Sequence, residues 1–185
     1  MSMLNKWDYS GVDEVCYSDA NEESYKKAAA FLGKDEPMED WGGGTGWARR
    51  YFTNYKNIDG SPHKYVDVIA DLVTYTSRVD NILLRQTLEC NVEWLQILNN
   101  AFKSFRKKLC IVIMTPDSSV TEIGCTEPSV KADGTIPIGD DIYMIFFNRQ
   151  ALLNNIVSSK YKVTEEVITT NQGYGRDWII YIERI

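Results

Sequence analysis

Four residues near position 40 have the types and spacing of a loop that binds a small molecule. The stretch from Asp40 to Gly46 reads Asp-Trp-Gly-Gly-Gly-Thr-Gly, with glycines at alternate positions 42, 44 and 46. Glycine reaches positive φ without penalty and has no Cβ to hold the backbone away from a ligand. A strand can turn sharply into a helix at such a loop and leave free amide groups facing a bound molecule. A flexible glycine turn without a ligand is the alternative, and the loop alone does not decide between the two.

The residues around this loop have the patterns of the strand and helix that a ligand loop requires. Residues 37–41 predict a short buried strand, and residues 47–52 predict the first turns of a helix. Upstream, Asp19 and Glu22 have the spacing of a capping box. Apolar residues then recur at helical spacing until Gly33: Tyr25, Ala28, Ala29 and Leu32. We therefore expect one helix before the loop.

Strand and helix patterns alternate along the rest of the chain. We expect strands at residues 55–59, 65–75, 81–84 and 109–114, the third and fourth short and apolar. A helix over residues 92–106 carries its apolar side chains on one face: Trp94, Leu98, Ala101, Phe102 and Phe105. Residues 117–141 have the composition of an irregular surface excursion. A short helix at 148–157 precedes two strands, 163–170 and 177–184, which the turn residues 171–175 join into an antiparallel hairpin. This alternation predicts an α/β layer fold.

Length, charge and cysteine usage limit the class of protein. The 185 residues fit one domain, and the net charge of −6 disfavours nucleic acid and anionic membranes as partners. The densest basic cluster, Lys103, Arg106, Lys107 and Lys108, is expected to close a helix. The four cysteines, Cys16, Cys90, Cys110 and Cys125, contain no Cys-x-x-Cys pair, and His63 is the only histidine, so we expect no metal site. The absence of a signal peptide or membrane-spanning run predicts a soluble cytoplasmic protein with free thiols.

Acidic residues follow the glycine loop at the ends of successive expected strands. Asp59 ends the strand at 55–59, Asp71 lies near the end of the strand at 65–75, and Gln86-Thr87-Leu88-Glu89-Cys90 follows the strand at 81–84. In this order, over residues 20–116, the motifs resemble those of compact class I S-adenosylmethionine-dependent methyltransferases, where the last segment often reads Leu-Glu-His. The resemblance implies a Rossmann-like α/β fold with a mostly parallel central sheet and an antiparallel C-terminal hairpin. It implies S-adenosylmethionine as cofactor, S-adenosylhomocysteine as product, and a small-molecule, sugar or other non-nucleic acceptor.

Carried onto this sequence, the resemblance gives each motif residue a role. Gly42, Gly44 and Gly46 would close around the methionine part of the cofactor, and Asp40 would anchor their turn. Asp59 would accept hydrogen bonds from both ribose hydroxyls, for which an ionised carboxylate is well suited. The remaining cofactor-binding residues would be Trp41, Thr45, Gly60, Asp71, Leu72, Arg85 and Gln86, with Asp71 taking the adenine amine and Arg85 and Gln86 beside the methyl group.

Each of these roles has a structural alternative. Asp59 before Gly60 is also a turn former, and Asp71 is also an ordinary strand end. Arg85 and Gln86 are equally compatible with a surface position. Trp41 and Trp47 flank the loop in the sequence and would form walls of the ligand pocket. The alternative is the core, where large aromatic side chains are found more often.

The sequence departs from the family in two places. Few residues separate Asp59 from Leu84, so the helix between the second and third strands is expected to be reduced, and the thinly covered sheet favours a homodimer. Cys90 stands where the family commonly has histidine, which leaves His63, Glu89 and Asp117 as candidate general bases.

We expect one domain over 1–185, with an N-terminal extension and helix at 1–36 and a substrate-side insertion at 117–147. A catalytically inactive methyltransferase-like binding protein is the main alternative, and a dinucleotide oxidoreductase fits the glycine spacing less well.

Overall fold

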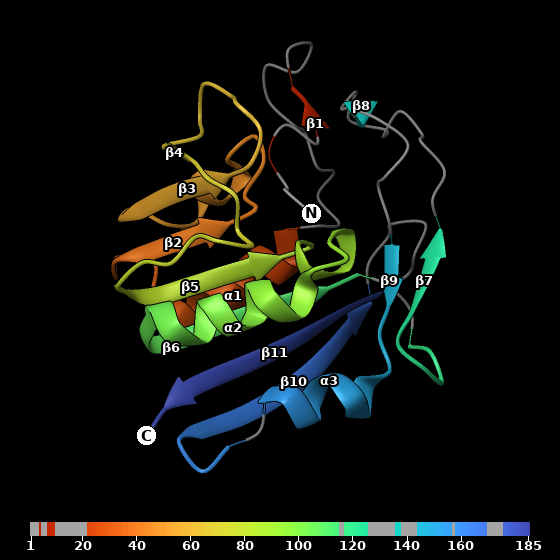
Figure 1. The fold of residues 1–185 in the computed structure, drawn as a ribbon. Helices are drawn as coiled ribbons and strands as arrows, with labels where there is room; N and C mark the ends of the chain where they lie inside the picture. Colours follow the sequence, from red (N-terminus) through yellow and green to blue (C-terminus); the bar gives the residue numbers. More distant parts are fainter. Residues whose placement is uncertain are drawn as a thin grey trace.

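A mixed sheet of seven strands forms the centre of the molecule (Figure 1). The computed structural model describes residues 4, 7–9, 22–114, 117–125, 136–137, 144–156, 158–169 and 176–185. In order across the sheet, the strands are β10 (Tyr161–Thr169), β11 (Arg176–Arg184), β6 (Phe105–Ile113), β5 (Val79–Arg85), β2 (Met38–Trp41), β3 (Tyr55–Asp59) and β4 (Val68–Ile69). The strands from β6 to β4 run parallel, and β11 is antiparallel to both of its neighbours. The α/β fold with an antiparallel C-terminal pair is therefore confirmed, while the turn residues 171–175 lie outside the described residues.

Helices cover both faces of this sheet. The helices α1 (Glu22–Leu32) and η2 (Trp47–Arg50), a single 3₁₀ turn, pack with Met38, Leu83 and Val112 on one face. The helices α2 (Trp94–Ser104) and α3 (Arg149–Ile156) pack with Ile82, Ile111 and other strand residues on the opposite face. Figure 1 shows α2 in front of the sheet and α1 behind it. Neighbouring residues of β5 thus alternate between two cores, as expected for a strand buried on both sides.

The connection between β3 and β4 contains no helix in residues 60–67, which confirms the predicted reduction. The strand expected over 65–75 is wrong in length, because only Val68 and Ile69 pair with β3. On one side of this pair, a carboxylate oxygen of Asp67 accepts the amide of Asn57 at 2.7 Å. On the other side, the amides of Thr74 and Tyr75 bond to the carbonyl of Asp71, and the chain turns away from the sheet.

Two expected helices differ from the structure at their ends. The helix after the glycine loop is only the 3₁₀ turn η2, because β3 begins at Tyr55 beside β2 and leaves few residues for the crossover. Helix α2 ends at Ser104, and the basic residues after it begin β6 instead of closing the helix. There, Lys107 forms an ion pair with Asp80 at 2.7 Å.

The expected surface insertion contributes two small sheets beside the main one. Strand β7 (Glu122–Cys125) pairs with β9 (Met144–Phe146), and β1 (Trp7–Asp8) pairs with β8 (Ile136–Pro137). The capping residue predicted at Asp19 lies outside the described residues. Within the described part of the chain, no helix is long and apolar enough to cross a membrane.

Candidate cofactor and substrate site

The glycine loop begins where the chain order of the sheet reverses. Strand β2 has β3 on one side and β5 on the other, all parallel, and ligands of open α/β sheets bind at the carboxyl ends of strands at such a switch point. Residues 42–46 follow β2 directly at this point, and η3 (Leu88–Cys90) follows β5. The fold therefore brings together the glycine loop and the segment after β5, which are two of the motifs predicted from the sequence.

Positive φ angles explain the three alternate glycines. Gly42, Gly44 and Gly46 have φ of 80°, 53° and 78°. A Cβ on Gly42 would lie 2.5 Å from the hydroxyl oxygen of Thr87, and one on Gly46 would lie 2.9 Å from Cβ of Tyr65. Only glycine satisfies both the angle and the space at these positions.

Gly43 is a fourth required glycine, which the alternate pattern missed. A Cβ there would lie 2.4 Å from Oδ1 of Asn57 and 2.6 Å from Oδ2 of Asp40. The carboxylate of Asp40 thus lies directly against the loop, and its role as the anchor of the turn stays a prediction. Asp40 Oδ2 makes no hydrogen bond to any described residue. Burial raises the pKa of Asp40 to about 7, the Arg85 guanidinium opposes this shift, and the nearby Asp59 carboxylate adds to it.

Asp59 connects the end of β3 to the glycine loop. Its Oδ2 accepts the amide of Gly44 at 2.9 Å, and its Oδ1 accepts the amide of Ser61 at 2.8 Å. Burial raises the pKa of this carboxyl, while these backbone hydrogen bonds lower it. A carboxylate oxygen has more than one acceptor position, so Asp59 retains capacity for a ligand hydroxyl beside Gly44.

The segment after β5 is held against the same loop. The Thr87 hydroxyl donates to the carbonyl of Trp41 at 2.8 Å. Before it, Gln86 has φ of 53°, the only positive value among the described non-glycine residues. Such backbone strain is found most often at functional sites. Arg85 is buried rather than superficial, and its Nε donates to the Ser24 hydroxyl of α1 at 3.1 Å.

The Arg85 guanidinium influences the pKa of buried carboxyls that belong to other elements. Glu89 and Asp177 of β11 are fully buried, and burial raises the pKa of both, to about 7 for Glu89. Arg85 opposes the shift in each case. Oε1 of Glu89 accepts the amide of Met114 at 2.8 Å, whereas Oε2 has no hydrogen-bond partner in the described part of the chain. No sequence motif indicated Asp177, because it lies far along the chain in an apolar strand.

The other candidate bases occupy different surroundings. His63 lies between the rings of Tyr9 and Tyr65, with centroid distances of 5.9 and 5.4 Å. Asp117 is exposed and lies 3.6 Å from Arg176 in an ion pair. Of the three predicted bases, only Glu89 is buried, and it lies in the segment after β5 whose Thr87 contacts the glycine loop.

The remaining predicted residues lie around the loop or in the core. The indole of Trp41 is fully buried and donates to Glu39, and that of Trp47 is also buried, which favours the core alternative for both. Leu72 lies in the same core as Trp41. Asp71 Oδ1 accepts the amide of Val73 at 3.0 Å. Thr45 is buried, and Gly60 follows Asp59 in the turn after β3.

Comparison with known proteins identifies the fold but no sequence relative. No protein-family model matches the chain, and no curated protein matches its sequence. The structure resembles Burkholderia thailandensis 1,6-didemethyltoxoflavin-N1-methyltransferase, solved with its toxoflavin compound and S-adenosylhomocysteine, at 11% identity. The TM-score is 0.67, over 91% of this chain and 79% of that one.

Two further solved structures show the same likeness. Magnesium protoporphyrin IX methyltransferase from Synechocystis, solved with its methyl donor bound, has a TM-score of 0.61 at 10% identity, over 90% of this chain and 80% of that one. A Mesorhizobium loti S-adenosylmethionine-dependent methyltransferase has a TM-score of 0.60 at 11% identity, over 90% and 99% of the two chains. The protein therefore has the fold of class I S-adenosylmethionine-dependent methyltransferases, as the motifs predicted.

Proposed function

We propose that this protein is a methyltransferase that uses S-adenosylmethionine to methylate a small molecule, sugar or other non-nucleic acceptor. The observation that carries the proposal is the hydrogen bond from the Gly44 amide to Asp59, which joins the two principal cofactor motifs within this fold. The solved neighbours support the acceptor class, since two of them are named for methylating a toxoflavin compound and a porphyrin.

The residues at the switch point fit such a cofactor. A Cβ at 42, 43 or 46 would clash with neighbouring side chains of the protein, so these glycines let the loop pack closely against them, whereas a Cβ on Gly44 would meet no described atom closer than 3.4 Å. Asp59 is placed to accept hydrogen bonds from ribose hydroxyls next to Gly44. Burial raises the pKa of Asp40, which lies against the loop, and a bound ligand with positive charge would favour its ionised form.

Bound S-adenosylmethionine supplies an electrophilic methyl group on a sulfonium whose leaving group is already good. Positioning by the protein therefore accounts for much of the expected acceleration. For an acceptor with a hydroxyl or ammonium group, a base is still required at the nucleophile. We assign this role to Glu89, whose Oε2 is available for a proton and whose pKa is raised to about 7.

Calorimetric titration with S-adenosylmethionine, S-adenosylhomocysteine and NAD tests the proposal. We expect binding of the first two and none of NAD. Lack of binding by both methyl compounds would overturn it. Transfer of labelled methyl groups into pools of small-molecule acceptors then tests turnover, and binding without any transfer would identify an inactive binding protein.

A further inference from the structure

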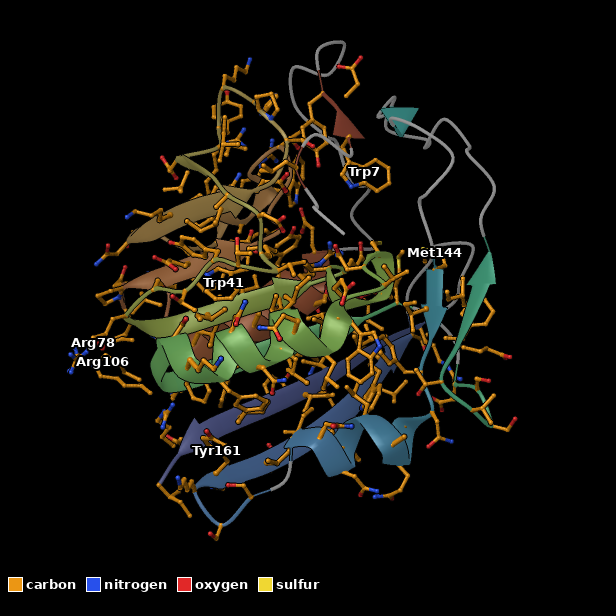
Figure 2. All side chains as sticks on the ribbon, viewed as in Figure 1. Trp7, Trp41, Arg78, Arg106, Met144 and Tyr161 are labelled. Carbon is orange, nitrogen blue, oxygen red and sulfur yellow. The ribbon has the colours of Figure 1, made fainter. Side chains whose placement is uncertain are left out.

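The N-terminal strand β1 lies beside the glycine loop although more than thirty positions separate them in the sequence. The Trp7 amide donates to the Ser61 hydroxyl at 2.9 Å. Tyr9 follows β1 directly and is only 8% exposed, and its hydroxyl lies 3.4 Å from the position that a Cβ on Gly44 would occupy. Figure 2 shows Trp7 on the side of the sheet where β5 ends, away from Tyr161.

Hydrogen bonds link β1 to Gly44 through the turn after β3. Ser61, which accepts the Trp7 amide, donates its own amide to Asp59 Oδ1. The other oxygen of Asp59 accepts the amide of Gly44. Each step is a direct contact, so the position of β1 and the conformation of the glycine loop depend on one another.

Ring contacts form a second link on the other side of Tyr9. His63 contacts Tyr9 edge-on, and Tyr65 packs against His63. The Arg49 guanidinium lies 3.7 Å from the Tyr65 ring centre and donates to the carbonyls of Thr45 and Gly46, at 3.1 and 2.8 Å. The segment that replaces the missing helix between β3 and β4 thus connects β1 to both halves of the loop.

We infer that β1 forms a wall of the cofactor site and that the Tyr9 hydroxyl binds a polar group of the cofactor beside Gly44. The inference rests on the proposed function. The Tyr9 ring is buried and its hydroxyl lies beside Gly44, whose φ is positive. Because Gly44 has no side chain, a ligand that contacts its backbone would also come within reach of the Tyr9 hydroxyl. His63 then supports the Tyr9 ring and is a positioning residue. Because β1 pairs with β8 of the insertion, the wall also joins the cofactor side to the expected substrate side.

Calorimetry on three tyrosine variants tests this role. Tyr9→Phe should weaken binding of S-adenosylmethionine and S-adenosylhomocysteine about tenfold, as for loss of one hydrogen bond to a charged group. Tyr9→Ala should weaken it further because the wall is lost. Tyr161→Phe, the same change against Phe102 and Phe105 at a distant part of the sheet, should leave the affinity unchanged. Circular dichroism and thermal melting confirm that each variant is folded.

Hydrogen exchange gives a second readout that does not depend on substitution. Binding of S-adenosylmethionine should slow exchange in the peptide that contains Trp7 and Tyr9. Unchanged affinity in both Tyr9 variants, or tighter binding by Tyr9→Ala, would overturn the inference, the latter by showing that the ring blocks the site. If the unmodified chain binds neither compound, the proposed function fails together with this inference; if it binds them but β1 does not respond, only the inference fails.

Discussion

At the scale of single residues, the glycine loop is specified more strictly than its alternate spacing indicates. Gly42 is required by its φ and by Thr87, Gly43 by Asp40 and Asn57, and Gly46 by Tyr65. Gly44 differs, because among the described residues only the hydroxyl end of Tyr9 lies within 4 Å of its Cβ position. Its missing side chain therefore serves access to the backbone more than internal packing.

Alanine substitution should separate these two roles. Gly42→Ala should destabilise the protein by about 2 kcal/mol or more, from the combined φ penalty and clash. Gly44→Ala should cost only about 1 kcal/mol, the penalty of left-handed backbone, yet weaken S-adenosylmethionine binding clearly. Urea denaturation and calorimetry measure the two effects. Equal stability losses would contradict the assignment.

Asp59 should determine affinity more than any other single side chain. We expect Asp59→Ala to weaken S-adenosylmethionine binding at least tenfold, from loss of about 1.5 to 3 kcal/mol for hydrogen bonds to a charged group. Asp59→Asn retains an acceptor for the Gly44 amide and should lose less. Titration calorimetry of both variants measures this, and an unchanged affinity in Asp59→Ala would show that the ribose assignment is wrong.

Glu89 should control the pH dependence of the reaction. Its folded pKa of about 7 lies above the ordinary value of 4.5, so the fold favours the neutral acid. The free energy of unfolding should therefore fall as pH rises from about 4.5 to 7, because the unfolded chain ionises Glu89 first, and this contribution is constant above pH 7. At pH 8, Glu89→Gln should be more stable than the unmodified chain. The base assignment requires kcat to rise through pH 7 and Glu89→Gln to be slow and pH-independent. Melting curves and pH-rate profiles check the two claims separately, and an unaltered profile in the variant would remove Glu89 as the base.

At the scale of elements, Arg85 at the end of β5 connects three parts of the fold. It bonds to Ser24 of α1, lies over the Tyr25 ring at 4.3 Å, and opposes the raised pKa of a carboxyl in β2, one after β5 and one in β11. Sequence reasoning left open whether it was a surface residue. Its burial could be recognised only after the strand order placed β5 in the middle of the sheet.

Replacing this guanidinium should cost more than a surface change of the same kind. Arg85→Met should destabilise by about 1.5 to 3 kcal/mol, because it removes a buried charged hydrogen bond to Ser24 and the cation that favours ionisation of the buried carboxyls. The loss should be smaller at pH 6 than at pH 8, since the carboxyls of Asp40 and Glu89 become neutral. Arg106→Met is the matched control, because that side chain is 57% exposed and should change stability little. Urea denaturation at both pH values measures the difference, and equal losses in the two variants would contradict the role of Arg85.

At the scale of the whole molecule, the helix-free connection between β3 and β4 leads to an edge strand with an exposed apolar side chain. β4 is an edge strand of two residues, and Ile69 on it is 56% exposed. The homodimer expected from the sequence stays a prediction. Sedimentation velocity should show a dimer that Ile69→Lys weakens, and a monomer at all concentrations would exclude it.

Most of the fold was predictable from the sequence because its signals are local. The glycines, the apolar runs of β5 and β6 and the face of α2 each reflect backbone freedom or periodic burial within one segment. The expected strand after Tyr65 failed because its alternation came from an edge strand whose pairing ends after Val68 and Ile69. Pairing with a neighbour, rather than propensity, determines strand length there.

By itself, the sequence determined that a glycine loop follows a buried strand and that an acidic residue ends the next one. The three-dimensional fold was needed to show that Asp59 bonds to Gly44, that Arg85 influences the pKa of both Glu89 and Asp177, and that Tyr9 reaches the loop. The physical reason is separation along the chain. Contacts between residues tens of positions apart depend on strand order and loop paths, and these follow from the packing of the whole sheet.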